Sequence, residues 1–159
     1  MKTLHKFNTF RLIIVVLMTK IKCILEVDMK LCYCHSDKPF ESCCEVYLSD
    51  SAIPVTAEQL MRSRYTAYAV HDVDYIMQTT HPATRKHYDP RSIKAWAESS
   101  IWQKLEVIGT RKGSASDTVG FVEFKAYYFD SVQQPQLHHE YSTFKKVDGT
   151  WFFVEGRVL

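Results

Sequence analysis

The sequence predicts an α+β fold in which helices come first along the chain and an antiparallel sheet follows. Three observations carry this prediction. Apolar residues recur at helical spacing between residues 56 and 99, and an alternation of period two replaces that spacing after Trp102. Asp148 and Gly149, a dipeptide typical of tight hairpins, separate the last two strand-like segments. Because the two kinds of element are segregated along the chain, we expect the helices to pack on one face of the sheet.

The helical half contains three segments, each with a recognisable N-terminal signal. Thr56 and Gln59 are spaced as a capping box before the first apolar stripe. Asp72 can cap a second helix, and Asp89 a third, in which proline occupies the first helical position. The predicted helical segments are 56–70, 73–80 and 90–100.

The second half is rich in β-branched and aromatic residues and contains four predicted strands. Val122, Phe124 and Ala126 share one face of the second strand. On the third strand, neighbouring His138 and His139 must point to opposite faces of the sheet. The four strands are predicted at 105–109, 118–129, 136–147 and 150–158.

Residues 1–28 differ from the rest of the chain. They carry five basic and two acidic residues, so the remaining 131 residues account for a net charge of −1 within the total of +2. Because these 131 residues carry no excess of positive charge, the sequence does not indicate nucleic-acid binding. The apolar run Leu12–Met18 is too short to span a bilayer. Three interpretations stay open for 1–28: a start placed too early, with Met29 as the alternative; a signal or anchor that would contact a membrane; or an extra helix.

Four of the five cysteines lie within residues 32–44, as C-x-C and, eight residues later, C-C. Adjacent cysteines have Cα atoms about 3.8 Å apart, which is too close for a relaxed disulfide. Four thiolates on two short segments match the tetrahedral preference of Zn²⁺, whereas free or redox-active thiols are the alternative interpretation. The predicted ligands are Cys32, Cys34, Cys43 and Cys44.

A four-cysteine site leaves no coordination position open, so the predicted Zn²⁺ is structural rather than catalytic. His35 could replace one sulfur, although a histidine beside such a cluster is more often a neighbour than a ligand. The metal would supply folding energy to a segment too short to build a core. The chain therefore divides into an N-terminal extension (1–28), a zinc knuckle (29–50) and a larger domain (51–159), and the knuckle and the domain are expected to unfold separately.

The cysteine segment LCYCHSDKPFESCC resembles the SEC-C motif, a small zinc-binding module also found at the end of the SecA translocation ATPase. The following LMRSRYTAY, together with AWAESSIWQKLEV and GTWFFVEG, is similar to the YchJ-like family of uncharacterised bacterial proteins. The resemblance extends from Leu31 to Gly156. It implies a nuclear transport factor 2-like (NTF2-like) domain, in which helices and a curved sheet form a cone, and it assigns metal positions to the four cysteines. The motif has glycine where this chain has His35 and Asp37, and glycine permits positive φ.

Cone-shaped domains often enclose a cavity, but the fold alone assigns no activity. Histidines could do acid-base chemistry there, acidic residues could assist them, and Arg64 could hold an anion. No serine-histidine-aspartate arrangement, phosphate loop or HExxH motif occurs in the sequence. No catalytic residue is therefore predicted, and whether the protein is an enzyme stays open. The candidate pocket residues are Arg64, Tyr68, Asp74, His81, Trp96, His139 and Trp151.

Two functions are consistent with these patterns. In the first, favoured from the sequence, the protein is an interaction module whose zinc knuckle docks onto a protein or ribosomal partner, as the resemblance implies. In the second, the cone binds a small molecule, with or without catalysis, and the knuckle is structural. Convergence of Arg64, Asp74, His81 and one of the two tandem histidines on a polar, roomy pocket would favour the second function, and a cone filled by aromatic side chains would favour the first. Reduced cysteines suit the cytoplasm in either case.

Overall fold

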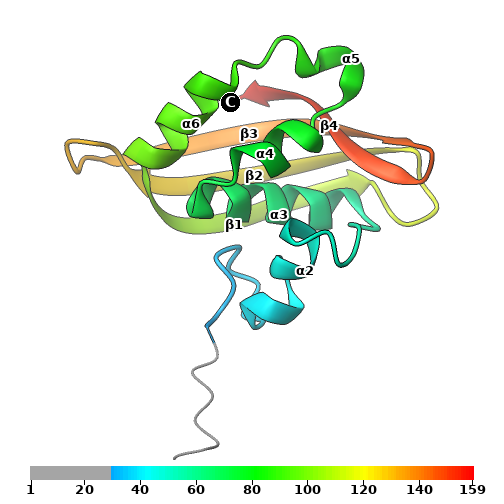
Figure 1. Ribbon diagram of the computed structural model, residues 1–159, viewed down its shortest axis with the longest axis horizontal. Coiled ribbons are helices and arrows are strands. Elements are labelled where there is room, and N and C mark those ends of the chain that lie inside the picture. Colours follow the sequence, from blue (N-terminus) through cyan, green and yellow to red (C-terminus); the bar gives the residue numbers. More distant parts are fainter. Residues whose placement is uncertain (1–29) are drawn as a thin grey trace, which may run out of the picture. The chain divides into compact units, whose positions relative to one another are not determined.

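The computed structural model describes residues 30–159, and the predictions for the segment 1–28 lie outside the described residues. Residues Leu31–Leu159 form one compact unit. It contains a cysteine knuckle with one short α-helix, four further α-helices and a four-stranded sheet (Figure 1). The predicted α+β class is confirmed, with helices before strands along the chain.

The sheet is an antiparallel meander in the order β1-β2-β3-β4. The last three strands lie within one residue of their predicted bounds, but β1 is longer than the predicted 105–109. Register shifts between Trp102 and Lys104 and between Val107 and Gly109 interrupt its pairing with β2, and these irregularities hide the period-two pattern in the sequence. The strands are β1 (Ile101–Lys112), β2 (Val119–Phe129), β3 (Pro135–Val147) and β4 (Thr150–Val158).

The hairpin between β3 and β4 is closed by the predicted dipeptide. Asp148 and Gly149 have φ values of 48° and 82°, and positive φ at both central residues is the signature of a type I′ turn. The twist of this turn matches the twist of the flanking strands. The turn thereby fixes the pairing of β3 with β4, which places Gly156 opposite Ser142.

The helices begin at the predicted caps. At the start of α3, Thr56 accepts a hydrogen bond from the Gln59 amide and the Gln59 side chain accepts one from the Thr56 amide, a complete capping box. Asp72 and Asp89 cap α4 and α6. Helix α5 is not predicted from the sequence, because His81 and Pro82 end one helical segment and also begin the next. The helices are α3 (Ala57–Val70), α4 (Val73–Gln78), α5 (Pro82–Arg85) and α6 (Pro90–Ser99).

Helix α3 is the central element of the fold. It contacts β1, β2 and β4 of the sheet as well as α4, α6 and the short helix α2 (Glu45–Leu48) of the knuckle. In Figure 1 the helices lie along the sheet, with α3 beside the knuckle and α6 near the C-terminal end of β4. One side of α3 therefore packs against the knuckle, and another side faces the sheet.

The hydrophobic core runs without a break from the sheet into the knuckle. Cys32, Cys34 and Cys44 are buried in the same cluster as Leu60 of α3 and Trp151 of β4. The 3-10 helix η1 (Phe40–Ser42) adds Phe40 to the edge of this cluster. The knuckle is therefore packed as part of the same core as the cone.

None of the helices in the described range, residues 30–159, is long and apolar enough to cross a lipid bilayer.

Candidate metal centre and cavity

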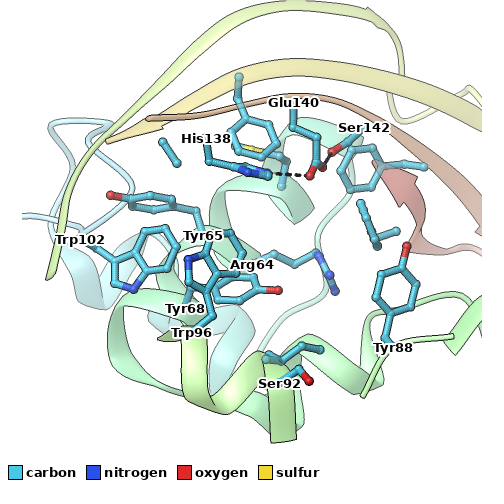
Figure 2. A pocket seen from close by; sticks show the side chains of 16 residues that line it. Arg64, Tyr65, Tyr68, Tyr88, Ser92, Trp96, Trp102, His138, Glu140 and Ser142 are labelled. Atoms are coloured by element: carbon cyan, nitrogen blue, oxygen red, sulfur yellow. Dashed lines mark hydrogen bonds and ion pairs between the residues drawn. The ribbon is translucent and has the colours of Figure 1, made fainter. Parts of the chain in front are cut away.

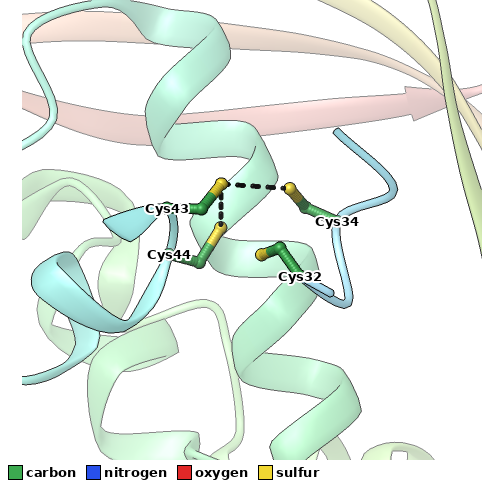
Figure 3. A group of neighbouring side chains, drawn as sticks. All are labelled: Cys32, Cys34, Cys43 and Cys44. Carbon is green, nitrogen blue, oxygen red and sulfur yellow. Dashed lines mark hydrogen bonds between the residues drawn. The ribbon is translucent and has the colours of Figure 1, made fainter. Parts of the chain in front are cut away.

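The four cysteines of the knuckle bring their sulfur atoms together in one cluster (Figure 3). All four Sγ atoms lie within 4.8 Å of one another. The Sγ atom of Cys43 is 3.6 Å from that of Cys34 and 4.0 Å from that of Cys44. A tetrahedral zinc ion with Zn–S bonds of about 2.3 Å separates its sulfurs by roughly 3.8 Å. The cluster thus has the donor atoms and the spacing that a zinc ion requires.

The loop between the two cysteine pairs keeps the backbone geometry for which the SEC-C motif uses glycine. His35 and Asp37 adopt positive φ values of 54° and 58°. Histidine and aspartate tolerate this region better than most residues, at some conformational cost. Hydrogen bonds from the Cys32 amide to Lys38 O (2.8 Å) and from the His35 amide to Cys32 O (3.1 Å) hold the loop. The substitutions at these positions therefore leave the cysteine cluster intact.

His35 lies outside the cluster, because its Nδ1 atom is 2.7 Å from the carbonyl oxygen of Tyr33. The crowded thiols interact strongly with one another. Hydrogen bonds from Cys34 and Cys44 lower the pKa of Cys32, whereas hydrogen bonding with Cys32 and burial raise the pKa of Cys44. Four thiolates in such a space repel one another unless a cation neutralises them, and a divalent metal ion provides that charge.

A second feature lies under the sheet, where helices α3 and α6 face strands β2, β3 and β4 across a cavity of about 310 Å³ (Figure 2). Its wall is largely aromatic and aliphatic, and a cavity of this size and character is typical of small-molecule sites. Trp96 of α6 meets Tyr68 of α3 and Trp102 of β1 with ring centroids 5.2 Å apart in each case. Apolar lining residues include Met61, Tyr65, Ile93, Phe124, Phe144 and Phe153.

One wall of the cavity is polar and comes from alternate residues of β3. His138, Glu140 and Ser142 share the face of the strand that points into the cavity (Figure 2). The His138 Nε2 atom lies 2.8 Å from Glu140 Oε2, and Ser142 donates to Glu140 Oε1. Burial alone would raise the pKa of Glu140, but the hydrogen bonds from His138 and Ser142 and the charge of Arg64 outweigh it, and the pKa is lowered.

Gly156 provides the space that this carboxylate occupies. It pairs with Ser142 across β3 and β4, and a Cβ atom built on it would collide with the Glu140 carboxyl group. Its φ is not in the left-handed region, so space rather than backbone conformation explains the absence of a side chain.

Arg64 faces the polar wall from α3, and only 8% of the residue is exposed. Its Nη1 atom donates to Ile76 O (2.7 Å), Thr79 Oγ1 (2.8 Å) and Thr80 Oγ1 (3.3 Å) near the end of α4. The guanidinium carbon lies 4.4 Å from the centroid of the Phe153 ring. Burial lowers the pKa of Arg64, but a guanidinium group stays protonated in proteins. The cavity therefore contains one fixed positive charge.

Three of the seven predicted pocket residues line the cavity: Arg64, Tyr68 and Trp96. The other four, which are Asp74, His81, His139 and Trp151, do not. Asp74 is exposed on α4, and the His81 Nδ1 atom accepts a hydrogen bond from the Ala83 amide at the start of α5. His139 lies on the opposite sheet face with its Nε2 atom 2.8 Å from Glu123 Oε1. Trp151 is buried in the core, and its Nε1 donates to Val55 O.

His139 was chosen from the sequence as the cavity-facing histidine in place of its neighbour His138, and neither Glu140 nor Ser142 was among the predicted pocket residues. One signal could have found them: His138, Glu140 and Ser142 alternate along the strand in phase with Phe144, which is buried. The alternation of side chains along β3 does not by itself show which face of the strand points into the cavity. The pairing of Glu140 with Phe124, whose face the sequence did predict, decides it.

The fold and the cysteine cluster define a class of protein, an NTF2-like domain preceded by a SEC-C-type knuckle. The family model described as "YchJ, middle NTF2-like domain" matches residues 56–156, and the chain belongs to this family. It is 45% identical over 126 residues to the UPF0225 protein GSU1048 of Geobacter sulfurreducens, which covers 79% of this chain and 78% of that protein. A UPF0225 protein of Actinobacillus succinogenes is 39% identical over 128 residues, or 80% of this chain and 82% of that protein.

Two solved structures share this architecture. The solution structure of RPA3114, a SEC-C motif containing protein from Rhodopseudomonas palustris, matches with a TM-score of 0.75 and 38% identity, and covers 82% of this chain and 99% of that one. A SEC-C motif containing protein from Psychrobacter arcticus matches with a TM-score of 0.68 and 32% identity, and covers 82% of this chain and 84% of that one. The family and fold expected from the resemblance are confirmed.

Proposed function

We propose that the protein binds a small organic molecule in the cavity between α3, α6 and the sheet, and that the four cysteines hold a structural zinc ion beside it. The observation that carries the proposal is the convergence of Arg64, His138 and Glu140 on a cavity that is otherwise apolar. Burying charged and polar groups is costly, and their presence on an open cavity rather than in the packed core favours a role in binding.

The proposal reverses the preference drawn from the sequence alone. A cone filled by aromatic side chains would have left the knuckle as the main candidate for function. The aromatic side chains here line a space of about 310 Å³ instead of filling it. Of the residues expected to converge there, Arg64 and one tandem histidine, His138, line this space, whereas Asp74 and His81 do not. An open space with convergent polar groups favours the second function, a small-molecule site with a structural knuckle.

The knuckle contributes to this function through α3. Arg62 donates to the Cys34 carbonyl oxygen over 3.1 Å, and Arg64, two residues later, faces the cavity. A zinc ion on the cysteines would supply charge neutralisation and a fixed anchor for that helix. A reducing compartment, the cytoplasm, suits such a site because it protects the thiolates from oxidation. Docking of a protein or ribosomal partner by the knuckle, which the resemblance implies, stays a prediction.

The test is to close the mouth of the cavity without touching its polar wall. Ser92 of α6 is exposed and lines the mouth, whereas Ala95 is exposed on the same helix and does not line the cavity. The probes are naphthalene and its carboxamide, carboxylate and methylammonium derivatives, titrated by calorimetry. We expect saturable one-to-one binding of at least one probe to the wild type and to Ala95→Trp, and its loss in Ser92→Trp. Binding to none of the four, or equal binding to both variants, would contradict the proposal.

A further inference from the structure

The free donors of Arg64 indicate which chemistry the cavity accepts. A guanidinium group has five N–H donors, and within residues 30–159 only those on Nη1 have protein acceptors. The side chain is held in place by these bonds and by Phe153, so Nε and Nη2 cannot turn away to bulk water. In the described part of the chain, only one fully enclosed polar side-chain atom lacks a hydrogen-bond partner, and that atom is Tyr65 Oη. The unpaired nitrogens of Arg64 are therefore not fully enclosed by protein atoms. The free N–H groups of Arg64 therefore reach the cavity.

Glu140 supplies the complementary group on the opposite wall. Each of its oxygens already accepts one hydrogen bond, from His138 or from Ser142, and a carboxylate oxygen can accept another. Across the described residues, no ion pair within 4.0 Å joins Glu140 to Arg64, although both line the same cavity. The two opposite charges thus face a shared space instead of pairing with each other.

We infer that the cavity selects a neutral, flat molecule that carries an adjacent hydrogen-bond acceptor and donor, as in a carboxamide. The acceptor oxygen binds the free N–H groups of Arg64, and the donor N–H binds Glu140. The flat body lies among Trp96, Tyr68 and the other aromatic side chains of the lining. This inference rests on the proposed function and adds the chemical class of the ligand.

Charge balance explains why the ligand is neutral. Among the described lining residues, Arg64 is the one arginine or lysine and Glu140 the one carboxylate, and the charges of these two side chains cancel. Burial raises the pKa of Tyr68 and of Tyr88, so both phenols are neutral at physiological pH. A carboxylate ligand would pair with Arg64 but would leave Glu140 beside a like charge, and an ammonium ligand would meet the same difficulty at Arg64. An apolar ligand would leave the buried donors of Arg64 without an acceptor.

The experiment compares the four naphthalene probes by calorimetry on the folded full chain. We expect the carboxamide to bind at least about tenfold more tightly than naphthalene, naphthoate and naphthylmethylammonium, because only the carboxamide forms a hydrogen bond with both charged side chains and adds no charge. Glu140→Gln keeps the size of the side chain but leaves the cavity positive. The preference should then shift by about tenfold or more from the carboxamide toward naphthoate.

The outer face of the sheet offers a matched control. His139 and Glu123 form the same kind of pair over the same 2.8 Å distance, outside the cavity, so Glu123→Gln should leave the order of the four probes unchanged. If Glu140→Gln does not fold, Gly156→Ala provides a second route. The Cβ atom of the alanine displaces the Glu140 carboxylate without changing its charge. This variant should weaken the binding of the carboxamide and leave the binding of the other three probes unchanged.

The outcomes separate the ligand class from the proposed function. Binding of the probes that Ser92→Trp abolishes, but with naphthoate, naphthylmethylammonium or naphthalene preferred by the wild type, would overturn the ligand class and leave the cavity as a binding site. An order of preference that Glu140→Gln does not change would overturn it as well. Binding that is insensitive to Ser92→Trp would instead remove the proposed function.

Discussion

At the scale of single residues, the cavity depends on a carboxylate that the fold protects in two ways. Gly156 leaves the space that Glu140 occupies, and His138 and Ser142 donate to its two oxygens. Arg64 adds a positive charge across the cavity and is itself held by the end of α4. Such an arrangement stabilises the ionised form of the carboxylate despite its burial.

The lowered pKa of Glu140 makes a prediction about stability and pH. A carboxyl group whose folded-state pKa lies below its ordinary value of 4.5 stabilises the fold above that pH, and the stabilisation is lost as pH falls through the folded-state pKa. We expect Glu140→Gln to lower the free energy of unfolding at about pH 7, and we expect this deficit to disappear as the pH falls below 4.5 through the folded-state pKa. Urea unfolding across this range measures it.

Ser142→Ala is the control for this measurement, since it removes one hydrogen bond but keeps the carboxylate. The free energy of unfolding of Ser142→Ala should still decrease as the pH falls, but by less than that of the wild type. A deficit of Glu140→Gln that stays constant across the whole pH range would show that ionisation of Glu140 does not contribute to stability.

At the scale of elements, α3 links the two features of the molecule. Arg62 and Thr66 face the knuckle, where Thr66 Oγ1 lies 3.9 Å from Cys32 Sγ, whereas Arg64 and Tyr68 face the cavity. Arg62 and Arg64, two residues apart on the helix, therefore lie on different sides of it. The position of α3 thus affects both the cysteine cluster and the polar wall.

The start of α3 is fixed by its capping box, which can be tested directly. We expect Thr56→Ala to lower the free energy of unfolding by about 1 kcal/mol, because the amide of Gln59 loses its acceptor. Chemical denaturation measures the change. Thr56→Ser keeps the hydroxyl acceptor and should remain near the wild type. Equal losses in both variants would indicate that the threonine methyl group, rather than the cap, is responsible.

The elements show what sequence reasoning reaches and where it stops. Caps and turns are local, so Thr56, Asp72, Asp89 and the Asp148-Gly149 turn were predictable from a few neighbouring residues. The four cysteines were predictable because their spacing alone brings them together. The alternation along β3 shows which side chains share a face, but only the pairing of β3 with β2 and the helices packed on the sheet show which face lines the cavity. The choice of His139 over His138 failed for this reason.

At the scale of the whole molecule, the knuckle and the cone share one core. The sequence predicted a two-part molecule in which the knuckle and the domain at 51–159 unfold separately. The burial of Cys32, Cys34 and Cys44 with Leu60 and Trp151 argues against separate unfolding, since disorder in the knuckle exposes one side of the common core. A metal ion on the cysteines would then stabilise all of residues 31–159 by binding only the folded state.

Loss of one ligand should therefore destabilise the whole unit. We expect Cys44→Ser to lower the metal content and to shift a single thermal transition down by on the order of 10 °C. Calorimetry and elemental analysis of the same samples measure both effects. His35→Asn is the matched control: His35 lies in the loop but outside the sulfur cluster, and asparagine accepts positive φ. It should keep both the metal and the transition temperature near those of the wild type.

A strong chelator provides an independent route to the same state, because it removes the ion without changing the sequence. Chelated wild type should melt close to Cys44→Ser, and chelator should leave the melting of Cys44→Ser unchanged. Two separate transitions, with the upper one at the temperature of the untreated wild type, would mean that the cone folds without the knuckle. A single transition that moves with metal content would instead mean that the ion, the helix α3 and the cavity wall are parts of one cooperative structure.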